Sequence, residues 1–259
     1  MKYRLETIPV WEAVERGASC PLCFLADRLE RQYVAFYLGD SVMTPEIRVQ
    51  VNDTGFCPRH FQQMVDGGNR LGLSLMASTH IESVREKLAG DKRVLAASAG
   101  RRSPRAKRTY YDRIEQMKQR RDTCPVCDRM DHTMRNYAYT LARLLSDEQA
   151  FCSAFGDSHG VCLDHLPFVL DVAHDALKPS ERQQLIEILF ALVDGDLADI
   201  HASLGEFAER FDYRNRKPMT EKLRQSVGRA IAKLTGRNRL ATPEETSTSK
   251  DTTRTAKKP

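Results

Sequence analysis

The sequence Cys20-Pro-Leu-Cys23 returns as Cys124-Pro-Val-Cys127, at an offset of 104 residues. A Cys-x2-His pair follows each copy, after 33 residues in the first case and 34 in the second. A duplication with one residue of drift explains both spacings, whereas chance does not. The eight residues of the pattern are Cys20, Cys23, Cys57, His60, Cys124, Cys127, Cys162 and His165.

This pattern is typical of structural zinc, because zinc takes four ligands at tetrahedral angles and three Cys with one His is a common set. A Cys-x2-Cys pair wraps two sulfurs around one ion, and a Cys-x2-His pair at a helix start places both ligands on one face. We therefore expect two zinc ions per chain, each tying the base of a helical loop. The expected ligands are Cys20, Cys23, Cys57 and His60 for the first ion, and Cys124, Cys127, Cys162 and His165 for the second.

Three other interpretations stay open, namely thiol–disulfide catalysis, iron–sulfur ligation and buried thiols without metal. Cys-Pro-x-Cys resembles a glutaredoxin-type motif, but the βαβ pattern of such proteins is missing and the Cys-x2-His pairs would be unexplained. Covalent haem is excluded, because Phe24 and Asp128 stand where that motif requires His. A four-ligand zinc site has no open position, so catalysis by these ions is not expected.

The apolar residues predict helices throughout. Leu25, Leu29, Tyr33 and Phe36 recur at intervals of four, four and three, which is typical of a helix lying on a core, and the residues after Cys127 repeat this rhythm. Alternation with a period of two is confined to residues 47–51, which already carry helix-start signals. We predict an all-α protein of two tandem helical repeats, each stapled by a Cys3His zinc site, followed by a long C-terminal helix and a disordered tail.

The expected domains follow from the repeats, since 259 residues exceed one average domain. Residues 1–90 form a first zinc-binding helical repeat and residues 91–109 a basic linker. Residues 110–235 form the second zinc-binding repeat with its long C-terminal helices. Residues 236–259, rich in Thr, Ser, Lys and Pro, are expected to be a disordered tail.

The strongest charge asymmetry lies between the repeats. Residues 92–121 contain eleven Lys and Arg against Asp112 and Glu115, a formal charge of +9 in a chain whose total is +5. Such a cluster can neutralise phosphates of a nucleic acid. A flexible, solvated linker is the plainer interpretation, because no helix-turn-helix or zinc-finger pattern is present and only Tyr110 and Tyr111 are interleaved.

The composition indicates a cytoplasmic protein. No apolar run approaches the roughly 20 residues of a membrane helix, and the first ten residues lack the features of a signal peptide. In a reducing compartment paired cysteines are more often metal ligands than disulfides. No glycine-rich phosphate loop, nucleophile elbow or zinc-protease motif is present, so the sequence suggests no small-molecule substrate and argues against an enzyme. The expected partner is a protein or a nucleic acid, with no membrane involved.

Several further motifs are shared with a known family. They are Thr7-Ile-Pro-Val10, Gly55-Phe-Cys-Pro-Arg-His60, Asn69-Arg-Leu-Gly-Leu-Ser-Leu75, Thr79-His80 and Phe211-Asp-Tyr-Arg-Asn215, together with the first Cys pair. The chain thereby resembles a bacterial family catalogued only as a domain of unknown function, number six thousand and sixty-two, over most of residues 5–235. The resemblance implies a cytoplasmic bacterial protein whose Cys and His motifs are family features, and it implies no activity.

The sequence favours a non-catalytic binding or regulatory module with structural zinc. One alternative is a redox-sensing zinc–thiolate switch, and another is a nucleic-acid-binding protein that uses residues 92–121. Because Arg59 lies inside the first Cys-x2-His pair and Asp164 inside the second, we expect the second site to lose zinc more easily. His80 is expected to be a surface or core residue, and Cys152 a small buried one.

Overall fold

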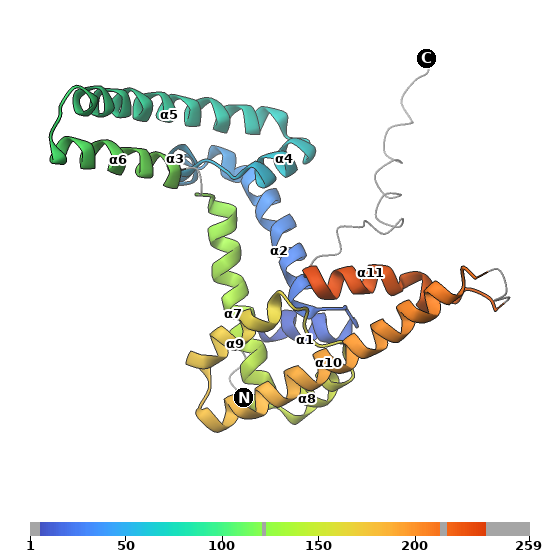
Figure 1. The fold of residues 1–259 in the computed structure, drawn as a ribbon. Helices are drawn as coiled ribbons and strands as arrows, with labels where there is room; N and C mark the ends of the chain where they lie inside the picture. The colour runs from blue at the N-terminus through green and yellow to red at the C-terminus, as the bar shows by residue number, and fades with distance from the viewer. Residues whose placement is uncertain (1–5, 121–122, 213–216, 237–259) are drawn as a thin grey trace, which may run out of the picture. The chain divides into compact units, whose positions relative to one another are not determined.

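The computed structural model describes residues 6–120, 123–212 and 217–236 (Figure 1). These described residues form eleven α-helices and one short 3-10 helix, without a strand. The predicted all-α class is therefore confirmed. The tail predicted to be disordered lies, from residue 237 onward, outside the described residues. No helix among the described residues combines the length and the apolar character needed to cross a membrane.

The chain divides into two compact units that differ from the expected domains. The terminal unit joins Met1–Leu25 to Asn136–Pro259, and the central unit is Ala26–Arg135. Helix α2 (Pro21–Leu38) begins in the terminal unit and ends in the central one, whereas α7 (Pro125–Asp147) does the reverse. The boundaries differ because the N-terminal residues pack with the second repeat and not with their own.

The terminal unit is built on aromatic and aliphatic packing. The rings of Trp11 and Phe151 pack edge to face with centroids 4.9 Å apart, and this contact holds α1 (Thr7–Glu15) against α8 (Gln149–Gly156). Phe151 and Phe155 are fully buried. The helices lying entirely within this unit are α1 (Thr7–Glu15), α8 (Gln149–Gly156), α9 (His165–Ala176), α10 (Pro179–Glu209) and α11 (Glu221–Thr235).

The central unit contains a long helical hairpin made of α5 (Arg70–Ala99) and α6 (Pro104–Gln119) (Figure 1). Near the hairpin's root, the buried carboxylate of Asp91 accepts two hydrogen bonds from Arg120, at 2.8 and 2.9 Å, and a longer one from Arg113 at 3.4 Å. The elements of this unit are η1 (Asp40–Met43), α3 (Pro45–Thr54), α4 (Pro58–Asp66), α5 (Arg70–Ala99) and α6 (Pro104–Gln119).

The hairpin corrects the prediction of a flexible basic linker over residues 91–109. Helix α5 continues to Ala99, and α6 begins at Pro104, so only a short turn separates them. Ser103 caps α6 by accepting a hydrogen bond from the backbone N–H of Ala106 at 3.2 Å, and proline is favoured in a first helical turn. The Ser-Pro signal thus marks a tight turn between two packed helices.

Candidate metal centres

The eight ligand-type residues gather into two groups of four whose ligand atoms all lie within 4.8 Å of one another. The terminal cluster consists of Cys20, Cys23, Cys162 and His165, and the central cluster consists of Cys57, His60, Cys124 and Cys127. Each cluster therefore combines the Cys-x2-Cys pair of one repeat with the Cys-x2-His pair of the other. Each lies wholly within the compact unit of the same name.

The predicted grouping by repeat is wrong, although the same eight residues are used. The reason is the length of the helices that follow the Cys-x2-Cys pairs. Helix α2 has 18 residues and α7 has 23, which correspond to about 27 and 35 Å of helix axis. Each helix carries the chain away from its own Cys pair into the other compact unit before the Cys-x2-His pair is reached.

The spacing within each cluster fits a tetrahedral zinc ion. Zinc–sulfur bonds of about 2.3 Å and zinc–nitrogen bonds of about 2.0 Å place sulfurs about 3.8 Å apart and the nitrogen about 3.5 Å from each sulfur. In the terminal cluster, Nδ1 of His165 lies 3.2 to 3.6 Å from the three sulfurs, and the sulfurs of Cys23 and Cys162 are 3.7 Å apart. All seven cysteines are free thiols. This cluster could hold a metal ion.

The central cluster has matching dimensions. Nδ1 of His60 lies 3.1 Å from the sulfur of Cys57, 3.3 Å from that of Cys124 and 3.4 Å from that of Cys127. The sulfurs of Cys57 and Cys127 are 3.8 Å apart. In both clusters Nδ1 is therefore the ring nitrogen that faces the sulfurs, and the donor set of three sulfurs and one nitrogen is the same.

Helix starts position the ligands, as the sequence predicted. Helices α2, α4 and α7 each begin at the proline that follows a ligand cysteine, and α9 begins at His165. Two helix N-termini therefore contribute to each cluster, and their positive dipole ends favour thiolate over thiol. The chain enters the two Cys-x2-His pairs through Gly55 and Gly160, whose φ angles of 66° and 65° lie in the left-handed region that favours glycine.

A carboxylate supports the histidine of the central cluster. Oε1 of Glu30 lies 3.0 Å from Nε2 of His60, and Oε2 accepts a hydrogen bond from Arg59 at 2.5 Å. The side chain of Glu30 is 8% exposed. Burial alone would raise the pKa of Glu30, but His60 and Arg59 lower it overall, so the carboxylate stays charged. A carboxylate–histidine pair of this kind fixes the tautomer and the ring orientation of a metal ligand.

Sequence reasoning missed Glu30. One signal could have revealed it: at the repeat offset of 104 residues its counterpart is Met134. One repeat thus places a carboxylate at a buried helix position where the other places an apolar residue, since Glu30 and Met134 are both buried. A buried acid normally has a partner, and that requirement points to a nearby base.

The end of α11 packs against the terminal cluster. The carbonyl oxygen of Gly236 accepts a hydrogen bond from the thiol of Cys23, and the backbone N–H of Leu163 donates to the carbonyl of Lys233 at 2.9 Å. A β-carbon on Gly236 would lie 3.3 Å from the sulfur of Cys162 and 2.9 Å from the β-carbon of Asp164, at a φ of +75°. This position requires glycine.

The chain matches the family of unknown function (DUF6062) over residues 1–240. It belongs to this family. The matched residues include both clusters and the whole α5–α6 hairpin. The chain matches no curated protein and no solved structure. Family membership therefore confirms the resemblance of the motifs and brings no activity with it.

The electrostatics of this family member's clusters differ from one ligand-type residue to the next. Bonds to Cys162 and Cys20 raise the pKa of Cys23, and burial together with the neighbouring cysteines raises that of Cys127.

The two histidines and Cys124 instead favour their charged forms. Burial alone would lower the pKa of His60, but its bonds to Cys124 and Glu30 raise it to about 10. The pKa of His165 is likewise about 10, because its bonds to Cys162 and Cys20 outweigh burial. Burial would raise the pKa of Cys124, yet His60 and three backbone amides lower it to about 6. A metal ion bound here would displace the imidazole proton.

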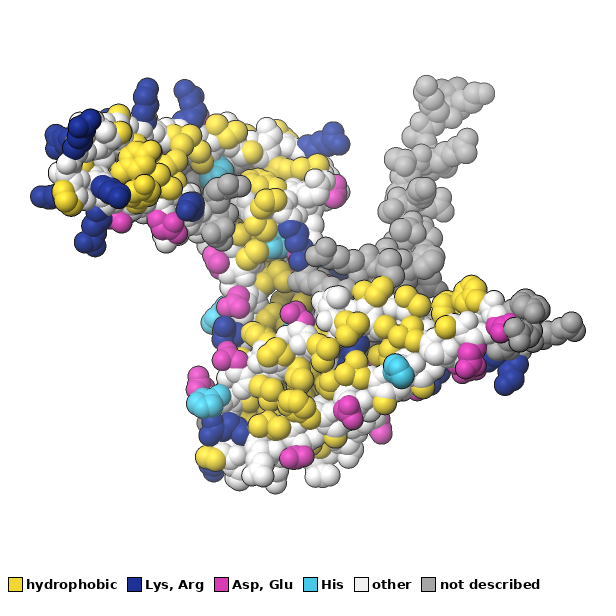
Figure 2. Space-filling model, viewed as in Figure 1, with side chains coloured by type: hydrophobic (Ala, Val, Ile, Leu, Met, Phe, Trp, Pro, Cys, Tyr) yellow, Lys and Arg dark blue, Asp and Glu magenta, His cyan; other side chains and the backbone are white. Residues whose placement is uncertain are grey.

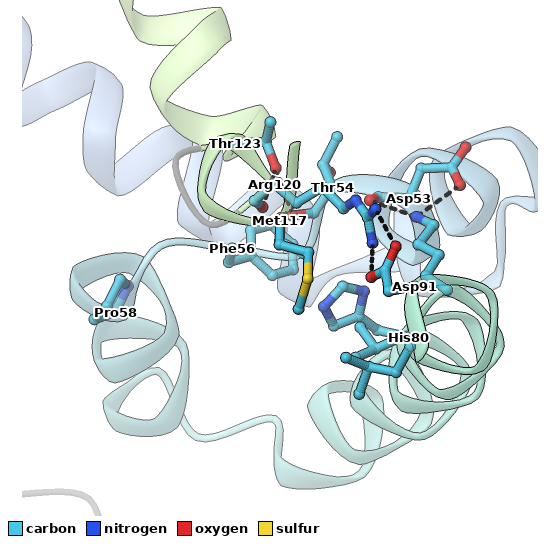
Figure 3. Close-up of a pocket in the computed structure, with 13 residues that line it drawn as sticks. Asp53, Thr54, Phe56, Pro58, His80, Asp91, Met117, Arg120 and Thr123 are labelled. Atoms are coloured by element: carbon cyan, nitrogen blue, oxygen red, sulfur yellow. Dashed lines mark hydrogen bonds and ion pairs between the residues drawn. The ribbon is translucent and has the colours of Figure 1, made fainter. Parts of the chain in front are cut away.

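A cavity of about 410 Å³ adjoins the central cluster (Figure 3). It is lined by Phe56 and Pro58, on either side of Cys57, and by the ring of His80. His80 is bonded through Nδ1 to the backbone carbonyl of Asn52 at 3.0 Å, so it is a positioned ring and not a cluster ligand. The lining cations are paired with carboxylates: Lys87 with Asp53, and Arg120 with Asp91.

The remaining Cys and His residues considered in the sequence lie outside both clusters. The thiol of Cys152 donates to the backbone carbonyl of Leu145 at 2.9 Å, and its side chain is half-buried. Nδ1 of His159 bonds Asp196 at 2.8 Å, so His159 does not replace His165 as a ligand.

Proposed function

We propose that the protein is a non-catalytic binding or regulatory module whose helices are held in place by two structural zinc ions. The observation that carries this proposal is the pair of complete Cys3His clusters with tetrahedral spacing. Protein atoms fill all four positions around each ion, which leaves none for water or substrate. Three thiolates with one imidazole suit zinc, whereas iron–sulfur clusters are held mostly by four cysteines.

Zinc would link segments that are distant in the sequence. An ion in the central cluster ties the start of α4 to the start of α7, and thereby closes the chain around the α5–α6 hairpin. An ion in the terminal cluster ties the start of α2 to the start of α9. The binding energy of structural zinc, about 10–16 kcal/mol in small zinc-dependent domains, becomes folding energy. We propose that the protein works in a reducing compartment such as the cytoplasm, because its thiolates must stay reduced.

Metal analysis tests this proposal. Protein purified without chelator or added metal is expected to contain two zinc ions per chain, with zinc-edge X-ray absorption showing three sulfurs and one nitrogen. The Cys57→Ser variant is expected to contain one. Cys152→Ser is the matched control, since its cysteine lies outside both clusters, and it should retain two. A native chain without zinc overturns the proposal.

A redox switch is the second candidate, and the exposure of Cys127 favours it. This ligand is the one exposed cysteine among the eight cluster residues. Peroxide that oxidises two thiolates to a disulfide is itself reduced to water, and the central cluster then loses its metal. Zinc release, followed with a zinc-sensitive dye at one equivalent of peroxide, should come first from the central cluster. A requirement for large excesses of peroxide would eliminate this candidate.

A further inference from the structure

The tip of the α5–α6 hairpin carries a dense group of cations, which we call the basic tip. Its members are Arg93, Arg101, Arg102, Arg105, Lys107 and Arg108, and all six are exposed. They lie in the last two turns of α5, the connecting turn and the first turn and a half of α6, within about 10 Å of helix axis. Figure 2 shows Lys and Arg side chains gathered over this end of the hairpin.

The charges of the basic tip are not neutralised locally. Among the described residues only one of the six has an acidic partner, Arg108, which lies 3.7 Å from Asp112 with both side chains exposed. The situation is different towards the root of the hairpin, where Asp91 pairs with Arg113 and Arg120. Arg113 and Arg120 towards the root are therefore paired with an acid, whereas five of the six cations at the tip have no acidic partner among the described residues.

Positive charge is concentrated in residues 92–121, which contain the basic tip, and in residues 210–259, which also carry +9. Residues 92–121 carry +9, whereas the chain as a whole carries +5, so the remaining residues sum to −4. Like charges closer than the Debye length of about 8 Å repel one another and destabilise the folded hairpin. The basic tip therefore does not stabilise the fold. Binding of an anionic partner would explain why so many cations are placed there.

We propose that the basic tip binds the phosphate backbone of a nucleic acid. Five of its six cations are arginines, whose planar guanidinium groups bind phosphate oxygens in pairs. Two packed helices present them, and the root of the hairpin is fixed by Asp91 and by a 2.9 Å hydrogen bond from Thr123 to the carbonyl of Thr54. A rigid support lowers the entropy lost on binding.

Two observations favour a nucleic acid over an anionic membrane. A helix that binds a membrane surface needs an apolar face beside its cations. The described tip exposes no large apolar side chain, and the nearest ones, Leu88 and Tyr111, lie beyond its ends. Tyr111 is 59% exposed, with its ring edge-on to Tyr110, and so offers a flat face on which a base can stack. The inference names the partner of the binding module proposed above and rests on that proposal.

Fluorescence anisotropy tests the inference with two labelled probes, a 20-base-pair DNA duplex and an RNA hairpin, which distinguish the two sources of phosphate backbone. If all six cations contact phosphates, affinity for the duplex should fall about a thousandfold between 50 and 200 mM salt. The variant Arg101→Ala/Arg102→Ala/Arg105→Ala should bind at least a hundredfold more weakly at 0.1 M salt. Its salt slope should be smaller by about 3.

The matched control is Arg31→Ala/Arg70→Ala/Arg85→Ala, which removes the same charge from exposed positions away from the tip. It should bind as the native protein does. Zinc content and circular dichroism of every sample separate a failed binding site from a failed zinc-held fold. The inference is overturned by absence of binding at 50 mM salt, by equal losses in both variants, or by stronger binding to phosphatidylserine vesicles or polyglutamate than to either nucleic acid.

Discussion

The two clusters share one ligand set but differ in what surrounds it. In the central cluster a buried carboxylate, Glu30, holds the histidine, while one cysteine, Cys127, is exposed. In the terminal cluster two cysteines are buried and the end of α11 covers them, but no described residue bonds Nε2 of His165. Equal ligands therefore need not give equal sites. We expect the central cluster to bind zinc more tightly at equilibrium and to react faster with reagents from solution.

Double serine variants should have the largest effect, because they test which pairs belong together. Cys20→Ser/Cys162→Ser removes two ligands from one cluster and should leave one zinc per chain. Cys20→Ser/Cys57→Ser removes one ligand from each cluster and should leave no tightly bound zinc. Elemental analysis after dialysis against a mild chelator gives the counts. Pairing within repeats predicts the opposite result for the two variants.

Loss of Asp196 should damage the terminal unit next most strongly. Its carboxylate lies 3.0 Å from the ammonium of Lys233, which is 1% exposed, in the helix whose end covers the terminal cluster. Asp196→Ala leaves the buried ammonium of Lys233 without its carboxylate, although it still donates to the backbone carbonyl of His159 at 2.6 Å. Removing one partner of a buried ion pair typically costs about 3–5 kcal/mol. We expect denaturation to show this loss and zinc to leave the terminal cluster faster. The double variant Asp196→Leu/Lys233→Met, which removes both charges, should recover most of the stability.

The pH dependence of this pair has a definite sign. Burial would raise the pKa of Asp196, but His159 and Lys233 lower it to about 2. A carboxylate whose pKa is lowered by folding stabilises the protein above its ordinary pKa of about 3.9, and this contribution disappears as pH falls through about 2. The native pair is therefore fully effective at neutral pH. The destabilisation by Asp196→Ala should shrink as pH falls from about 4 to about 2, and denaturation of the native protein and the variant across this range measures it.

Glu30 should separate the affinities of the two clusters. Removing a carboxylate that orients a metal-bound histidine typically weakens metal binding 10- to 100-fold. Glu30→Ala should lower the zinc affinity of the central cluster by about this factor and leave the terminal cluster unchanged. Competition with a zinc-binding dye measures both. Met134→Leu changes the counterpart position without a charge, and it should alter neither affinity. An equal loss at both clusters after Glu30→Ala would contradict this role.

The sequence was sufficient for the eight residues that gather in the two clusters, for the helix starts and for the all-α class, because spacing and capping are local properties. It could not give the pairing, since the intervals of 33 and 34 residues are the same whether each Cys-x2-His pair returns to its own partner or to the other one. The outcome depends on where α2 and α7 end, which is a matter of packing. The prediction of a flexible linker over residues 91–109 was wrong for a similar reason. Ser103-Pro104 is compatible with a flexible linker and with a tight turn, and the bond between Asp91 and Arg120, which are distant in the sequence, favours the turn.

The smallest expected effect concerns Arg59 and Asp164, which the sequence identified as the source of unequal zinc retention. The guanidinium of Arg59 is bonded to Glu30, so its charge is largely offset, and its side chain is 45% exposed. Asp164 is the N-cap residue of α9, where the helix dipole favours a negative charge. Exposed charges of this kind contribute about 0–1 kcal/mol, so Arg59→Gln and Asp164→Asn should each change zinc affinity no more than about fivefold.

Salt distinguishes the two causes of unequal retention. An effect of exposed charges should shrink at 1 M salt, where the Debye length is about 3 Å, whereas the support that buried Glu30 gives to His60 should persist. Chelator competition at 0.05 and 1 M salt measures both. If the terminal cluster still empties first at 1 M salt, and Glu30→Ala reverses that order, then the buried carboxylate sets the order of zinc loss. If the order instead disappears at high salt, the original assignment to Arg59 and Asp164 is correct and Glu30 serves only to hold the fold.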